Sequence, residues 1–236
     1  MVKFIYAPQW FYGKDILMDI VSIIVLLLIA FFSIKYYQTK KNRNYIYLTL
    51  SFTMLAASFL FKILMNLNFY YKVIETVPLG PITVTYESLK SSHTLFFYSF
   101  LLYWFLTLFG FYILYSIYQK QSWVDFLFGT YLLFMVTFYA YPSYQAFHVT
   151  LFILLALITY IHARKYLNQK HYTNKLVTYS FGMITLSQAF FNLVDFNDSF
   201  YVTAEIIQLI GYLCLLITFI MVLRYGRKED KTGHHR

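Results

Sequence analysis

Apolar runs of about 20 residues recur along the whole chain, separated by short polar stretches. An α-helix of roughly 20 apolar residues is long enough to cross the ~30 Å hydrocarbon core of a bilayer. The pattern therefore predicts an all-α membrane protein, a seven-transmembrane-helix bundle that forms a single domain over residues 1–236. The expected helices are about 15–37, 45–67, 94–118, 123–141, 144–166, 175–196 and 200–224.

Two of these apolar regions are similar to each other without a gap. Residues 24–64 align with residues 153–193 at an offset of 129 positions, and 13 of the 41 aligned positions are identical. Gly110 and Gly211 align in the third and seventh helices. We therefore expect a parallel 3+1+3 internal repeat about an axis along the membrane normal. The alternative is chance similarity between two apolar hairpins. The identical polar positions include Thr49/Thr178, Ser51/Ser180, Ser58/Ser187 and Lys41/Lys170.

Composition agrees with a membrane protein and excludes a soluble domain. Hydrophobic residues make up 60% of the chain and charged residues only 12%, whereas soluble domains carry about 25% charged residues. Cys214 is the single cysteine, so the chain forms no intrachain disulfide.

The formal net charge of +9 is explained by membrane topology rather than by nucleic-acid binding. Of the 19 basic residues, 14 fall in loops and a tail that lie on one side of the predicted bundle. The positive-inside rule makes that side cytoplasmic, with the N-terminus outside and the C-terminus inside. We expect a multi-pass protein of the plasma membrane.

Polar side chains within the predicted helices gather in the outer half of the bundle. An ionisable residue in a membrane span is a candidate functional residue because its burial is costly. We expect an outward-facing pocket in which Lys62 pairs with Glu205 or Asp195. The alternatives are that Lys62 extends to the headgroups and that the other groups are ordinary wetted helix ends. The candidate ligand-binding residues are Lys62, Asn66, Gln188, Asn192, Asp195, Glu205, Gln208, Tyr103 and Trp104.

Asp19, His93 and His148 lie at the same level as these candidates. Metal or haem ligation by the two histidines is an alternative, but they lack the i, i+4 spacing typical of such sites. No catalytic motif is present, so we expect neither an enzyme nor a resident cofactor or metal. Residues 68–93 form the one long loop, in which turn residues followed by an alternating apolar and polar stretch predict a short outer hairpin.

The seven spans, their orientation and the 3+1+3 repeat resemble the opsin and SWEET-type transporter architectures. Opsins bind retinal through a lysine of the last helix, and residues 200–223 contain no lysine, which argues against retinal. SWEET-type carriers hinge at prolines within their helices, and the four prolines here fall outside the spans. Residues 204–212 are also similar to the last helix of seven-span sensor domains.

These observations favour a seven-helix sensor or receptor-like protein. We expect its outer pocket to bind a small ligand or a lipid headgroup, and its basic face to signal through a membrane or cytoplasmic protein partner. The alternatives are a small-molecule transporter, in which the two repeats move about the same pocket, and a structural subunit of a membrane complex. Membrane lipid is an expected partner, and nucleic acid is not.

Overall fold

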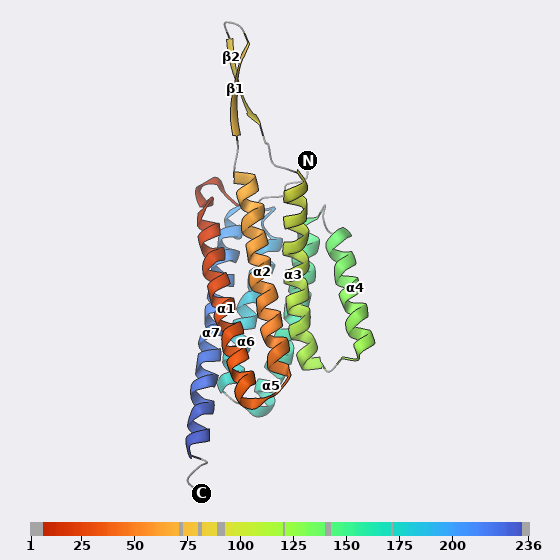
Figure 1. The fold of residues 1–236 in the computed structure, drawn as a ribbon, viewed down its shortest axis with the longest axis vertical. Helices are drawn as coiled ribbons and strands as arrows, with labels where there is room; N and C mark the ends of the chain where they lie inside the picture. The colour runs from red at the N-terminus through yellow and green to blue at the C-terminus, as the bar shows by residue number, and fades with distance from the viewer. Residues whose placement is uncertain are drawn as a thin grey trace.

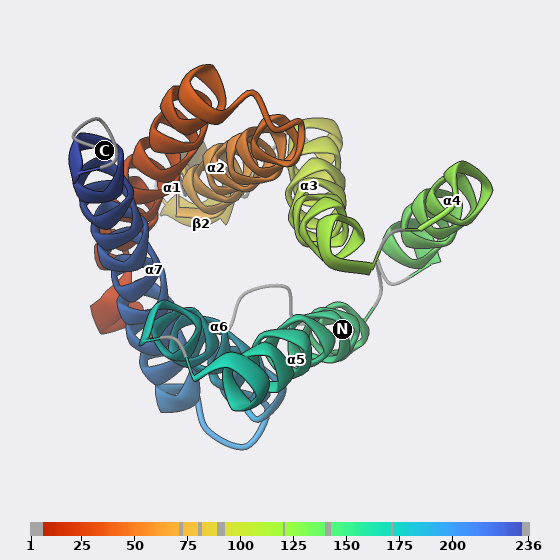
Figure 2. The same ribbon diagram turned by 90° about the horizontal axis from the view of Figure 1, so that it is seen from below.

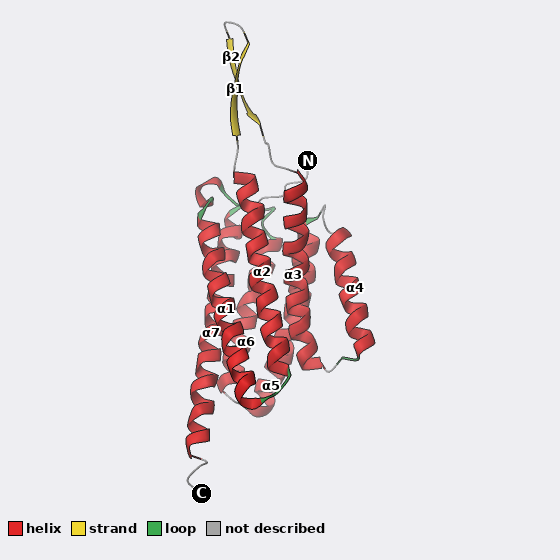
Figure 3. Cartoon of the chain, in the orientation of Figure 1, coloured by secondary structure: helices red, strands yellow, loops and turns green. Residues whose placement is uncertain are grey.

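A computed structural model describes residues 7–70, 73–79, 82–88, 93–119, 121–139, 143–170 and 172–232. It contains seven α-helices over these residues, and each predicted helix corresponds to one of them (Figure 1, Figure 3). The helices are α1 (Lys14–Lys40), α2 (Asn44–Tyr70), α3 (His93–Gln119), α4 (Trp123–Tyr139), α5 (Tyr144–Gln169), α6 (Tyr172–Asn192) and α7 (Ser199–Thr232). A 3₁₀ turn, η1 (Gln9–Phe11), precedes α1.

Five of the helices in the described part of the chain are long and apolar enough to cross a membrane. Their apolar segments are Lys14–Thr39 in α1, Asn44–Leu67 in α2, Leu95–Gln119 in α3, Tyr144–Gln169 in α5 and Ser199–Val222 in α7. Helix α4 is apolar but has 17 residues, and α6 has 21 residues with a more polar composition. The chain therefore fits a multi-pass helical membrane bundle.

Six of the helices close into a ring, which Figure 2 shows along its axis. The packing runs from α1 to α2, α3, α5, α6 and α7, and α7 returns to α1. Helix α4 packs against α3 outside the ring. Each ring helix therefore turns one face to the interior and another outward, which explains why Leu26, Ile29 and Leu55 are fully buried while Ile24, Leu27 and Phe31 are exposed.

Successive helices run in opposite directions, so their connections alternate between two ends of the bundle (Figure 1). The α1–α2, α3–α4 and α5–α6 connections lie at one end, where α7 also ends. We call this the basic end, because Lys41, Arg43, Lys165 and Lys170 lie there. The opposite end is the hairpin end.

The predicted hairpin is present between α2 and α3. Strands β1 (Val73–Leu79) and β2 (Ile82–Ser88) pair antiparallel, with Val77 opposite Val84, and they extend away from the helices (Figure 1). Gly80 and Pro81, at the predicted turn, lie outside the described residues. The hairpin confirms the strand assignment that its alternating sequence predicts.

The ends of α1 and α5 have the same backbone geometry. Lys41 and Lys170 both adopt the left-handed conformation, with φ of 53° and 49°. The Lys41 N–H donates to the Tyr37 carbonyl at 2.8 Å, and the Lys170 N–H donates to the Tyr166 carbonyl at 2.7 Å. Each helix is thereby closed by a left-handed cap, which satisfies one of its last free carbonyl groups.

Two glycines allow neighbouring helices to approach closely. A Cβ on Gly110 of α3 would lie 2.9 Å from Leu55 Cγ and 3.2 Å from the Ser51 carbonyl oxygen of α2. A Cβ on Gly211 of α7 would lie 2.6 Å from Ile184 Cγ1 of α6. Small residues that bring helix backbones together are a common way of packing helices in membranes.

We predict that Gly211→Ala lowers the free energy of unfolding by about 1–3 kcal/mol, because its methyl group would overlap Ile184. Gly182→Ala is the matched control, since a Cβ there would lie 3.9 Å from Thr159 Cγ2, an ordinary contact. In a helix this control is expected to be neutral or to stabilise by up to about 1 kcal/mol. Thermal unfolding of the purified variants in detergent measures the difference, and equal unfolding temperatures would contradict the packing.

Candidate functional site

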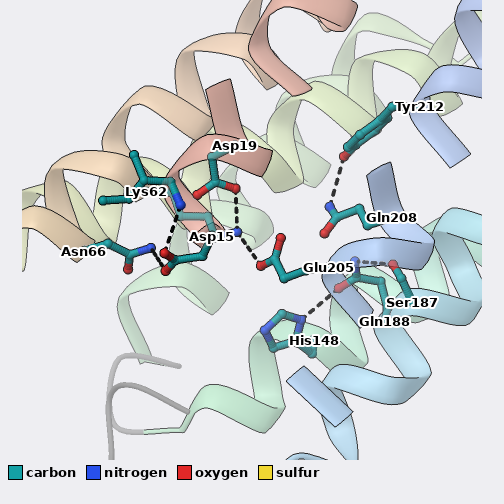
Figure 4. A network of polar contacts seen from close by, with 11 residues as sticks. Asp15, Asp19, Lys62, Asn66, His148, Ser187, Gln188, Glu205, Gln208 and Tyr212 are labelled. Atoms are coloured by element: carbon teal, nitrogen blue, oxygen red, sulfur yellow. Dashed lines mark hydrogen bonds and ion pairs between the residues drawn. The ribbon is translucent and has the colours of Figure 1, made fainter. Parts of the chain in front are cut away.

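Lys62 is the centre of a buried ionic cluster that joins three helices near the hairpin end (Figure 4). Its Nζ atom lies 2.8 Å from Oδ1 of Asp19 on α1 and 2.5 Å from Oε1 of Glu205 on α7. The side chains of the three residues are 6%, 1% and 4% exposed, respectively. The Lys62 ammonium group therefore points into the bundle and not outward.

A second polar contact extends the cluster by one helical turn. Asn66 of α2 donates from Nδ2 to Oδ2 of Asp15 on α1 at 3.1 Å, and both residues are buried. Asp15 and Asp19 are four residues apart, as are Lys62 and Asn66, so each pair lies on one face of its helix. The antiparallel packing of α1 and α2 thus places two polar contacts one above the other.

The opposite side of the interior is formed by an amide and imidazole network on α5 and α6. Nδ1 of His148 lies 2.8 Å from Oε1 of Gln188, whose Nε2 donates to the Ser187 hydroxyl at 3.2 Å. Because the Gln188 amide nitrogen donates elsewhere, its oxygen accepts from His148, which makes Nδ1 the protonated ring nitrogen. The imidazole ring is stacked on Phe191 with 4.6 Å between centroids.

A cavity of about 30 Å³ lies between these two polar groups. Its polar lining comes from α2, α3, α5 and α7, and its apolar lining includes Phe100 and Phe191. A space of this size holds one or two water molecules. The polar and aromatic lining residues are Lys62, Asn66, Tyr103, Trp104, Tyr144, His148, Tyr201 and Glu205.

The structure brings most of the sequence-predicted site residues to this place. Lys62, Asn66, Tyr103, Trp104 and Glu205 line the cavity together. Their predicted role in binding a ligand stays a prediction.

The other four candidates lie beside the cavity or outside it. Gln188 is adjacent through His148, and Gln208, one turn from Glu205, donates to the Tyr212 hydroxyl at 3.1 Å. Asn192 is half-buried and donates to the Gln188 carbonyl at 2.8 Å. Asp195 is exposed and accepts a hydrogen bond from Gln145, so of the two predicted partners of Lys62 only Glu205 contacts it.

Sequence reasoning did not assign Asp19 as a partner of Lys62, because an acid in the first turns of a helix has an ordinary role there. The available signal was the matching i, i+4 spacing of Asp15/Asp19 and Lys62/Asn66 at the same predicted depth of adjacent spans. Tyr201 was also missed. It is 7% exposed and lies against Phe191 across the cavity, with 5.7 Å between ring centroids.

Among the described residues, two carboxyl groups share one lysine. Asp19 and Glu205 both contact Lys62, and all three residues are at most 4% exposed. Within the described residues, Oδ2 of Asp19 has no hydrogen-bond partner. A buried carboxylate oxygen without a partner is costly, so a polar or positively charged group placed beside it would be stabilising.

The described residues contain no group of three His, Cys, Asp or Glu side chains placed to hold a metal ion. The side chain of His93, one of the two histidines considered for metal or haem ligation, lies outside what the structure describes. His148 is engaged by Gln188.

Comparisons with models of protein families, with curated proteins and with solved structures found no match to this chain.

We predict that Lys62→Met lowers the free energy of unfolding by about 3–5 kcal/mol, because Asp19 and Glu205 stay buried without their shared partner. Replacing all three residues together, as Asp19→Leu, Lys62→Met and Glu205→Met, is expected to recover most of that loss, since no unpaired charge remains. Thermal unfolding in detergent measures both effects.

Asp195→Asn is the control for this series, because Asp195 is exposed and outside the cluster. Its expected effect is within about 0.5 kcal/mol. A triple variant as unstable as Lys62→Met alone would show that the loss comes from packing and not from unpaired charge.

Proposed function

We propose that the chain is a seven-span membrane sensor or receptor-like protein, in which a small ligand acts on the ionic cluster around Lys62. The observation that carries the proposal is the shared contact of one lysine with carboxyl groups of α1 and α7, beside a polar cavity in an apolar bundle. In this proposal α4 and α6 also cross the membrane, the hairpin end faces outward, and the protein lies in the plasma membrane.

Matched contacts in the two halves of the bundle support the proposed 3+1+3 repeat. Gly110 approaches Ser51 and Leu55, whereas Gly211 approaches Ser180 and Ile184, which lie 129 positions further along the chain. The left-handed caps at Lys41 and Lys170 are related by the same offset. The ring order supports it too, because each contact of α1, α2 and α3 has a counterpart among α5, α6 and α7.

The grouping of basic residues at one end of the bundle supports a cytoplasmic position for the basic end. We predict that, in a Cys214→Ser background, Ser199→Cys on intact cells reacts with a membrane-impermeant maleimide, because the start of α7 lies at the hairpin end. Thr39→Cys, at the end of α1, is expected to react only after permeabilisation, and both positions are exposed. The reverse labelling would overturn the orientation.

The packing toward the basic end favours a sensor over a transporter. Below the cavity, the interior is filled by fully buried apolar side chains from α2, α3, α6 and α7, among them Leu55, Leu108, Ile184 and Leu215. His162 is buried nearer the basic end, where its ring lies between Tyr118 and Phe181. A transported solute would have to separate these contacts.

Ligand binding would change the bundle because the cavity accommodates only one or two waters. A larger ligand enters by separating Lys62 from Asp19 or Glu205, and either step loosens α2 from α1 or α7. A ligand shifts such an equilibrium by its differential affinity for the two arrangements. The output is then a changed arrangement of these helices at the basic end, read by a protein partner.

We predict that a screen of small carboxylates, amines and zwitterions identifies a compound that stabilises the wild-type protein against thermal unfolding. Saturation at 100 times the dissociation constant adds about 2.7 kcal/mol. Glu205→Gln is expected to abolish or weaken that shift, because it removes one charge of the cluster, whereas Asp195→Asn is expected to retain it.

Reconstituted vesicles separate the two candidate functions with the same compound. Binding without uptake is the result expected of a sensor. Uptake into vesicles that depends on Glu205 would replace the sensor with a transporter, and an unchanged shift in Glu205→Gln would remove Glu205 from the site.

A further inference from the structure

A second cavity lies at the basic end, far along the helices from the Lys62 cluster. It has a volume of about 320 Å³ and lies between the last turns of α3 and α5. Its polar lining side chains are Gln119, Arg164, Lys165 and Asn168, and its apolar walls include Leu157 and Ile161. This volume is in the range of small-molecule sites, about 300–1,000 Å³.

The two basic side chains of this cavity are not neutralised within the described part of the chain. Neither Arg164 nor Lys165 forms an ion pair with a described carboxylate. The Lys165 ammonium group lies 4.4 Å from the ring centroid of Tyr118, which also lines the cavity. Arginine and lysine beside amide donors are the groups that bind a phosphate in proteins.

An exposed apolar stripe on α5 leads from the middle of the helix to these basic groups. Ile153, Leu157, Tyr160 and Arg164 follow i, i+4, i+7 and i+11 spacing, so they lie on one face. Ile153, Leu157 and Tyr160 are 54%, 44% and 63% exposed. Helix α4 packs against α3, whereas the main neighbours of α5 are α3 and α6. A ligand in the cavity therefore lies beside an exposed apolar stripe on α5. This stripe runs along the helix for about the length of an acyl chain.

We propose that this cavity binds the headgroup of an anionic phospholipid, with the phosphate at Arg164 and Lys165 and an acyl chain along Leu157 and Ile153. Basic pockets between helices on the cytoplasmic side suit anionic headgroups. The exposed apolar stripe on α5 favours a lipid over a soluble phosphate, because only a lipid has an acyl chain that can cover this stripe. The binding does not depend on the function of the Lys62 cluster.

The bundle contains a natural comparison for this site. A larger cavity of about 620 Å³ lies between α2, α3 and α4, and none of the described residues that line it is charged. Leu50, Phe109 and Phe126 are among its walls. Lipid in this second cavity meets no charged side chain among the described residues, so the preference for anionic lipid is expected of the α3–α5 cavity.

The test is native mass spectrometry of the full chain, released from nanodiscs that contain equal amounts of phosphatidylglycerol and phosphatidylcholine with identical acyl chains. The wild-type protein is expected to retain phosphatidylglycerol in excess. General attraction to a membrane surface contributes about five-fold per basic side chain, or on the order of 25-fold for two. Arg164→Gln with Lys165→Gln is expected to lower the retained ratio by more than this, because it also removes the contacts of the phosphate in the cavity.

Lys35→Gln with Arg43→Gln is the matched control, because it removes the same charge from exposed positions at the basic end outside the cavity. An equal fall of the ratio in both double variants would show general surface attraction and overturn the site. Leu157→Trp keeps every charge and fills the cavity, so it is expected to reduce retained phosphatidylglycerol while leaving phosphatidylcholine unchanged.

Two further results would overturn the proposal. Displacement of the retained lipid by glycerol phosphate at an equal concentration would assign the cavity to a soluble phosphate. A lipid-free dimer that dissociates in Arg164→Gln with Lys165→Gln would assign this face to contact between two copies of the chain.

Discussion

The structure depends on where three charged side chains find partners in a bundle of apolar helices. Lys62, Asp19 and Glu205 are each nearly inaccessible to solvent, and each would be strongly destabilising alone. Their contacts therefore determine how α1, α2 and α7 are placed at the hairpin end. A contact of this kind is also sensitive to a ligand, because any group that replaces one partner must still satisfy the other two.

Positions 129 residues apart show how the two halves of the ring differ at this level. The Asp19–Lys62 ion pair between α1 and α2 has its counterpart in His148 stacked on Phe191 between α5 and α6. One half is held by charge and the other by an uncharged ring contact, although the same two helix faces meet. The cavity lies between them, with Glu205 of α7 completing the charged side.

Toward the basic end the two halves are instead alike. The glycine contacts at Gly110 and Gly211 bring α3 onto α2 and α7 onto α6 with similar neighbours. This packing leaves no room for a Cβ, so the helices are held closely where the interior is apolar. The bundle thus combines a closely packed apolar part with a polar part that contains a small cavity.

The number of helices and most of their approximate ends followed from hydrophobic runs, because a membrane span needs a fixed length of apolar residues. The end of the last helix did not, because α7 continues past the predicted 200–224 to Thr232, through a polar stretch that hydrophobicity does not mark as helix. The hairpin followed from its turn residues and alternation. Lys62 and Glu205 stood out as candidates, because charges in apolar spans are rare. A contact of Lys62 with Glu205 was expected only as an alternative to one with Asp195. The periodicity of a sequence shows which face of a helix a residue lies on, but not which other helix that face contacts.

The sequence by itself determined a bundle of apolar helices, its two chemically different ends and the residues whose burial requires a partner. Only the tertiary structure decided that α4 lies outside the ring, that Asp19 and not Asp195 shares Lys62, and that the cavity between the helices is small. The physical reason is that helix formation depends on local hydrogen bonds and apolar length. The pairing of buried charges depends on the rotation and order of helices, which side-chain packing among distant segments determines.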